Sequence, residues 1–126
     1  MKWLRRHRPG TFAAAAVLAA HCECEAATFR RTATELGFGY NSLDFEAAFT
    51  IDVRGRQGDR CVRQHFQTVR VHAIVTTSDP AEALAAVIEE TEARCPVMNL
   101  LLDAKVNRQI EWLRDNGGTL QPASRV

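Results

Sequence analysis

The sequence predicts one domain of the α+β class, in which a long first helix and a second helix pack on an antiparallel sheet. The length of 126 residues suits one domain. Residues 11–36 are good helix formers without a turn residue. Residues 44–54 and 66–77 instead alternate apolar and polar side chains, which is typical of half-buried strands.

The first helix is expected to span 11–36, with Gly37 as its C-terminal stop. Alanine, the best helix former, dominates its beginning. Apolar side chains cover much of its circumference, so we expect it to lie buried between other elements or between subunits.

A secretory signal is the competing interpretation of residues 1–22, where a basic start precedes a short apolar run. Arg5 and Arg6 are similar to a twin-arginine signal, and Cys22 stands where a lipoprotein signal places its cysteine. His21 occupies a position that needs a small residue there. We favour the helix, because its pattern continues well beyond Cys22.

Two strands are expected to pair as a hairpin across a polar, glycine-containing connection at 55–64. The inward side chains of the first strand are Phe45, Ala47, Phe49, Ile51 and Val53. Those of the second strand are Val69, Val71, Ala73 and Val75.

A second helix is expected to begin at Asp79-Pro80-Ala81-Glu82 and to end near residue 94. Asp79 suits the capping position, Pro80 the first helical position, and Glu82 completes a capping box. The inward stripe contains Leu84, Val87, Ile88, Thr91 and Cys95.

After Pro96 we expect a short helix at about 96–103. Residues 106–113 fit either a strand or a helix, because their apolar side chains satisfy both periods. The ends of the chain, 1–10 and 116–126, are expected to be frayed.

Composition limits the function classes. With 46% hydrophobic and 25% charged residues the chain is typical of globular proteins. A net charge of +1 and the lack of a long apolar run predict neither a nucleic-acid partner nor a membrane span. Four cysteines are few for a secreted disulfide scaffold, so we expect a reducing, cytoplasmic location.

Cys95 is the first candidate for thiol chemistry. If Pro96 begins a helix, Cys95 caps it, and the free backbone N–H groups there favour a thiolate. A thiolate attacks peroxides and disulfides. The alternative is a small buried residue that only caps the helix.

Cys22 and Cys24 stand two residues apart in the first helix, about 200° around its axis, so they face opposite sides. Cys22 shares the apolar stripe of Leu18, Phe29, Ala33 and Leu36. Cys24 lies with Ala20, Ala27 and Arg31, and a nearby arginine would lower the pKa of its thiol.

A metal site is the other possibility for these side chains, whose types suit zinc or copper. The candidates are His21, Cys22, Cys24, Cys61, His65 and His72. Their spacing contains no Cys-x-x-Cys pair, so we expect no metal and no bound cofactor. Cys61 lies in a polar loop and is expected to be incidental.

Three stretches of the chain resemble the OsmC/Ohr family of thiol-dependent hydroperoxide reductases. The first is LAAHCECEAATFRRTATELGF at 18–38, which resembles the family's central helix with Cys24 as its cysteine. The second is FTIDVRG at 49–55 with the returning strand at 66–75. The third and most specific is the helix at 83–103, which leads into Cys-Pro-Val.

The resemblance implies an intertwined homodimer with its sites at the subunit interface. It implies that Cys24 attacks an organic hydroperoxide and becomes a sulfenic acid, which Cys95 resolves to a disulfide. An irregularity of one turn in the helix would make Cys22 the reacting thiol instead. A dithiol reductant, often lipoyl-linked in this family, would then restore both thiols.

The chain also departs from the family pattern. Members carry several strands, with an activating arginine, before the central helix, so residues 1–126 are expected to form a single, N-terminally shortened OsmC-like domain. Active members carry a glutamate near the start of that helix, where this chain has alanines at 13–16. The alternative function is therefore a catalytically inactive OsmC-like protein with a binding or structural role.

Overall fold

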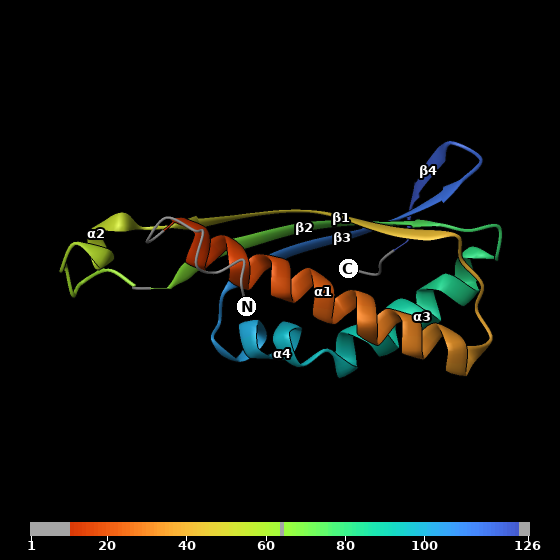
Figure 1. Cartoon of the computed structure of the whole chain (residues 1–126), viewed down its shortest axis with the longest axis horizontal. Coiled ribbons are helices and arrows are strands. Elements are labelled where there is room, and N and C mark those ends of the chain that lie inside the picture. The colour runs from red at the N-terminus through yellow and green to blue at the C-terminus, as the bar shows by residue number, and fades with distance from the viewer. Residues whose placement is uncertain (1–10, 64, 124–126) are drawn as a thin grey trace.

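A computed structural model describes residues 11–63 and 65–123, in which three helices cover one face of a four-stranded sheet (Figure 1). The strands are β1 (Ser42–Ile51), β2 (Phe66–Thr76), β3 (Asn107–Asn116) and β4 (Thr119–Pro122), and they lie side by side in this order. The predicted α+β class is confirmed.

The sheet is mixed, which corrects the expectation of an antiparallel one. Strands β1 and β2 are antiparallel, β2 and β3 are parallel, and β3 and β4 are antiparallel. Helices α3 (Ala81–Arg94) and α4 (Pro96–Asp103) form the connection between β2 and β3. A helical crossover of this kind returns the chain to the end of the sheet where β2 began, so β3 runs parallel to it.

Helix α1 (Thr11–Leu36) has the predicted bounds. Gly37 adopts a φ of 70°, which a residue without a Cβ tolerates. The N–H of Phe38 donates to the carbonyl of Ala33 at 2.8 Å, and that of Gly37 to Thr34 at 3.3 Å. These bonds form a Schellman motif, and the buried Phe38 turns the chain toward β1.

The hairpin of β1 and β2 is confirmed, with Phe45 opposite Ala73 and Phe49 opposite Val69. The first strand ends at Ile51 rather than at residue 54. The Asp52 side chain accepts the Arg54 N–H and caps a single turn, α2 (Val53–Arg56). Val53 is consequently 54% exposed and does not belong to the inward face.

Helix α3 begins at Ala81, and the predicted capping box is wrong. Pro80 occupies the capping position without a side-chain hydrogen bond. The Asp79 carboxylate instead accepts the Gly39 N–H at 2.8 Å, and the Asp79 carbonyl accepts two hydrogen bonds from Arg114. Asp79 therefore ties the loop after α1 to the sheet. The inward stripe of α3 is buried as predicted, at Leu84, Val87, Ile88 and Thr91.

The ambiguous segment forms β3, and the expectation of a frayed tail from 116 is wrong. Gly117 and Gly118 both adopt positive φ and turn the chain into β4. Trp112 is fully buried, stacked on Phe29 with ring centroids 5.5 Å apart and set edge-on to Phe45 at 6.3 Å. Residues 1–10 and 124–126 lie outside the described residues.

The core lies between the sheet and the helices. One cluster surrounds Phe29 and Trp112, and a second contains Leu18, Val69 and Val71. Phe45 and Ile110 pack against both clusters, which joins them. Over residues 11–63 and 65–123, no helix has the length and apolar character needed to cross a membrane.

Candidate active site

The two predicted cysteines lie together where α1 crosses the junction of α3 and α4. The Sγ atoms of Cys24 and Cys95 are 3.6 Å apart, although the residues are far apart in the sequence. Cys24 is half-buried, whereas Cys95 is fully buried. A disulfide needs about 2.05 Å between its sulfurs, so closure requires a movement of about 1.5 Å.

Cys95 ends α3 and caps α4, with Pro96 at the first position of that helix. The predicted capping role is confirmed, but burial outweighs the expected stabilisation of a thiolate by the helix start. Burial raises the pKa of Cys95 to about 11, and the Met98 backbone N–H lowers it by less than burial raises it. Cys95 is therefore a neutral thiol at physiological pH.

Cys22 lies on the other side of α1, as its spacing from Cys24 predicted. It lines an apolar groove of about 520 Å³ between α1 and β1, together with Leu18, Phe45 and Phe49. Burial, and next the charge of Glu25, raise the pKa of Cys22. The predicted stripe ends before Leu36, which is 50% exposed.

Arg31 was expected to lie near the Cys24 thiol, but its side chain pairs elsewhere. Seven residues separate it from Cys24, about 10 Å along the helix axis. Its Nε atom pairs with Glu35 at 3.4 Å, and the side chain is 82% exposed.

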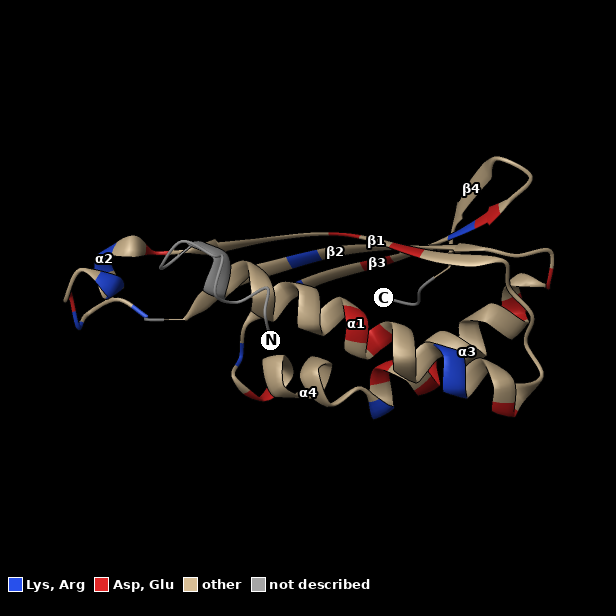
Figure 2. Ribbon diagram, in the orientation of Figure 1, with Lys and Arg blue, Asp and Glu red and all other residues tan. Residues whose placement is uncertain are grey.

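A buried acid next to Cys24 was not found by sequence analysis. The Glu25 carboxyl group is fully buried, and neither oxygen has a hydrogen-bond partner among the described residues. Burial, and next the charge of Glu92, raise the pKa of Glu25 to about 8, against the opposing effect of Arg108. Figure 2 shows acidic positions of α1 close to those of α3.

His21 lies one turn before Glu25, with its Nε2 atom 3.9 Å from the carboxylate. Burial, and next the charge of Arg108, lower the pKa of His21, so the imidazole is neutral. A helical-wheel argument would have found Glu25, because it lies four residues after His21 and four before the buried Phe29. Arg108 was not singled out, because the secondary structure of 106–113 was ambiguous and its approach to His21 and Glu25 depends on the tertiary position of β3.

The side chains considered for a metal site are dispersed. His21 is buried inside, Cys61 and His65 are exposed near α2, and His72 is on the sheet. Within the described part of the chain, no three His, Cys, Asp or Glu side chains are grouped so as to hold a metal ion.

The family model of OsmC-like proteins matches residues 9–111. The chain belongs to the OsmC family. The predicted family is thereby confirmed, and the match includes both Cys24 and Cys95. No curated protein matches the chain.

Several solved structures share the fold. An OsmC-like protein from Mycoplasma pneumoniae is 17% identical, with a TM-score of 0.69, and the match covers 79% of this chain and 68% of that one. A putative redox protein from Lactobacillus casei is 28% identical, with a TM-score of 0.59 and coverages of 87% and 71%. The organic hydroperoxide resistance protein OhrB of Bacillus subtilis is 17% identical, with a TM-score of 0.52 and coverages of 83% and 69%.

Proposed function

We propose that this OsmC-family chain reduces organic hydroperoxides, with Cys24 as the attacking thiol and Cys95 as the resolving thiol. The observation that carries the proposal is the distance of 3.6 Å between the two sulfurs. Cys24 lies on α1, and Cys95 lies at the junction of α3 and α4. Structural neighbours are named as hydroperoxide resistance and redox proteins, which agrees with this chemistry.

The environments of the two thiols support this division of roles. Cys24 is half-buried and therefore accessible to a small peroxide, whereas Cys95 is fully buried. The raised pKa of Cys95 keeps it as a thiol, which is a poor nucleophile toward a peroxide. Cys95 therefore suits the second step, in which its sulfur is already next to Cys24.

The reaction is balanced by two thiols. The Cys24 thiolate attacks one peroxide oxygen, the O–O bond breaks, and the leaving alkoxide takes a proton and departs as an alcohol. Cys95 then attacks the Cys24 sulfenic acid, and its proton leaves with the hydroxyl group as water. An external dithiol, such as a lipoyl-linked one, reduces the disulfide and is itself oxidised.

We also propose that residues 1–126 form one OsmC-like domain that assembles as a homodimer. Phe45 and Ile110 pack against both core clusters, which supports one domain. Leu100 and Leu102 of α4 are 65% and 49% exposed, and the described helices leave one face of the sheet uncovered (Figure 1). Sedimentation analysis tests this: a monomer at micromolar concentration contradicts it.

The test of the thiol mechanism is intact mass and disulfide mapping after one equivalent of cumene hydroperoxide. We expect rapid loss of two hydrogens and a Cys24–Cys95 disulfide, and no disulfide in Cys24→Ser. In Cys95→Ser, a sulfenic acid trapped by dimedone should accumulate on Cys24. Thiols that oxidise no faster than free cysteine would contradict the mechanism and favour the catalytically inactive alternative.

A further inference from the structure

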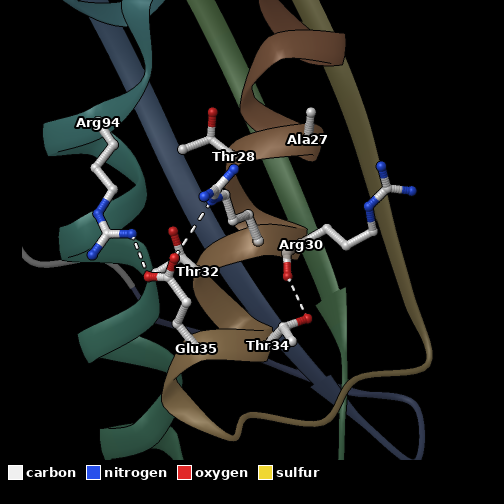
Figure 3. Close-up of a pocket in the computed structure, with 8 residues that line it drawn as sticks. Ala27, Thr28, Arg30, Thr32, Thr34, Glu35 and Arg94 are labelled. Carbon is white, nitrogen blue, oxygen red and sulfur yellow. Dashed lines mark hydrogen bonds and ion pairs between the residues drawn. The ribbon is translucent and has the colours of Figure 1, made fainter.

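A cleft of about 840 Å³ lies along α1, on the side where Arg94 of α3 approaches it (Figure 3). Three arginines and one carboxylate line it, so its charge is cationic. They are Arg30, Arg31, Arg94 and Glu35. The remaining lining residues are Ala27 and the three threonines Thr28, Thr32 and Thr34.

One hydroxyl group in this cleft is unused. The Thr28 and Thr34 hydroxyls donate to the carbonyls four residues before them, those of Cys24 and Arg30, at 2.8 and 3.0 Å. Thr32 is fully buried, and its hydroxyl has no hydrogen-bond partner among the described residues. Because a buried hydroxyl without a partner is costly, this donor points to a ligand that the cleft accepts.

Glu35 shows how a carboxylate fits between the arginines. Its oxygens contact Arg94 at 2.6 Å and Arg31 at 3.4 Å, and Figure 3 shows the Arg94 contact bridging the two helices. The hydrogen bond from Arg94 holds the pKa of Glu35 below its ordinary value. All three side chains are partly exposed, at 42% or more, so an external carboxylate can compete for the same guanidinium groups.

Two residues that line the cleft are neighbours of the thiol-bearing residues. Arg94 precedes Cys95 in the chain, and Thr28 bonds to the Cys24 carbonyl one turn away. Arg31 lies about 10 Å along the helix axis from Cys24. A flexible ligand can therefore hold a carboxylate in the cleft while its other end reaches the sulfurs.

We infer that this cleft is a carboxylate-binding subsite for ligands of the Cys24–Cys95 pair, with Arg94 and Arg31 as the main contacts and Thr32 as an additional donor. This inference rests on the proposed function, because it assigns the subsite to a ligand of the same thiols. The carboxylate belongs either to the hydroperoxide or to a free dithiol acid such as dihydrolipoate, whereas a lipoyl group linked to a protein through an amide has none.

Binding is tested without turnover by titrating the reduced protein with octanoate and with neutral octanamide, followed by amide shifts in ¹H–¹⁵N spectra. Octanoate should shift the amides of Thr32, Glu35 and Arg94, and octanamide should not. Equal shifts with both probes, or none up to about 10 mM, would overturn the inference.

Three variants sharpen the binding test. Arg94→Gln should weaken octanoate binding about tenfold, as expected for a lost charge-assisted hydrogen bond. Glu35→Gln should strengthen binding, because it removes the competing carboxylate while keeping the helix. The matched control is Arg70→Gln on the uncovered face of the sheet, where the Arg70 Nε–H donates to the Gln109 side chain, and it should leave binding unchanged. Weaker binding in Glu35→Gln would contradict the competition.

Turnover identifies the source of the carboxylate through two matched pairs. Linoleate hydroperoxide is compared with its methyl ester, and dihydrolipoate with dihydrolipoamide. The pair in which the carboxylate raises kcat/KM in the wild type but not in Arg94→Gln identifies the ligand. Equal kcat/KM within both pairs would overturn the subsite even if peroxide is reduced. If no peroxide is reduced, the proposed function fails, and the octanoate titration alone decides the inference.

Discussion

The two sides of α1 place two cysteines, only two residues apart, in opposite surroundings. On the side toward α3 and α4, the Cys24 thiol meets a second thiol, that of Cys95. On the side toward β1, Cys22 lines an apolar groove and has no second thiol within hydrogen-bond distance among the described residues. The difference teaches that the face of the helix, and not the presence of a cysteine, decides which thiol can take part in redox chemistry.

The strongest test of this difference between the two cysteines is to replace each of them separately by serine. Cys24→Ser should lower the peroxidase kcat/KM by at least about a thousandfold, to the background rate, because the nucleophile is lost. The matched variant Cys22→Ser should change it by no more than about twofold. Stopped-flow consumption of cumene hydroperoxide measures both. A large loss in Cys22→Ser alone would reverse the two assignments.

Glu25 lies between the two sides and makes stability depend on pH. Its pKa is about 8 in the folded protein, against 4.5 for a free side chain, so the folded state holds this proton more tightly. Stability is therefore fully present below pH 4.5 and falls as the pH rises to about 8. At about 1.4 kcal/mol per pKa unit, the loss is roughly 4–5 kcal/mol.

Urea unfolding of wild type and Glu25→Gln at pH 5 and pH 9 tests this. The wild type should lose stability between the two pH values, and Glu25→Gln should lose far less, because its amide does not ionise. The exposed acid Glu82 provides the control, since Glu82→Gln should keep the wild-type pH dependence. The same slope in Glu25→Gln would show that other groups cause it.

The orientation of α1 depends on Phe29, which packs on the apolar side. Phe29 is fully buried, stacked on Trp112 and set edge-on to Tyr40 at 5.1 Å. Phe29→Ala should lower the free energy of unfolding by about 3–5 kcal/mol through the cavity it leaves. Phe49 of β1 has a half-buried ring that lines the groove beside Cys22, so Phe49→Ala should lower the free energy of unfolding by less. Equal losses would contradict this ranking of the two packing sites.

Much of the fold is predictable because local patterns and packing agree. The alternation of β1 and β2, the inward stripe of α3 and the Gly37 stop each follow from a few neighbouring residues. Residues 106–113 are different, since Val106, Ile110 and Leu113 suit a helix. The local pattern suits a strand equally well, and the tertiary partners of Trp112, which are Phe29 and Phe45, decide for the strand although they lie far away in the sequence.

The candidate site was predictable in part. The family pattern identified Cys24 and Cys95, but the raised pKa of Cys95 depends on burial by surrounding elements, which capping rules do not contain. Asp79 illustrates the same limit: its sequence context is that of a helix cap, yet Gly39 and Arg114 determine its contacts.

The smallest expected effect concerns the end of α1. Gly37→Ala should destabilise the protein by about 1 kcal/mol, because alanine at a φ of 70° is strained although no neighbouring atom obstructs it. Gly39→Ala should cost less, since its φ is not in the left-handed region and only the Asp79 carboxylate lies near the added methyl group, at 3.6 Å. Thermal unfolding of the two variants side by side measures the difference, and a larger loss in Gly39→Ala would contradict it.

The position of Cys95 between two helices has a topological consequence. A bond from Cys24 to Cys95 would convert the stretch from α1 to the start of α4, including β1 and β2, into a covalent ring. By the chain-entropy model, closing a ring of about 70 residues restricts the unfolded chain enough to favour folding by about 4 kcal/mol. The oxidised protein should therefore unfold at a higher urea concentration than the reduced one. Each catalytic cycle would pass through a state that resists unfolding more than the resting state, so oxidant itself would protect the fold.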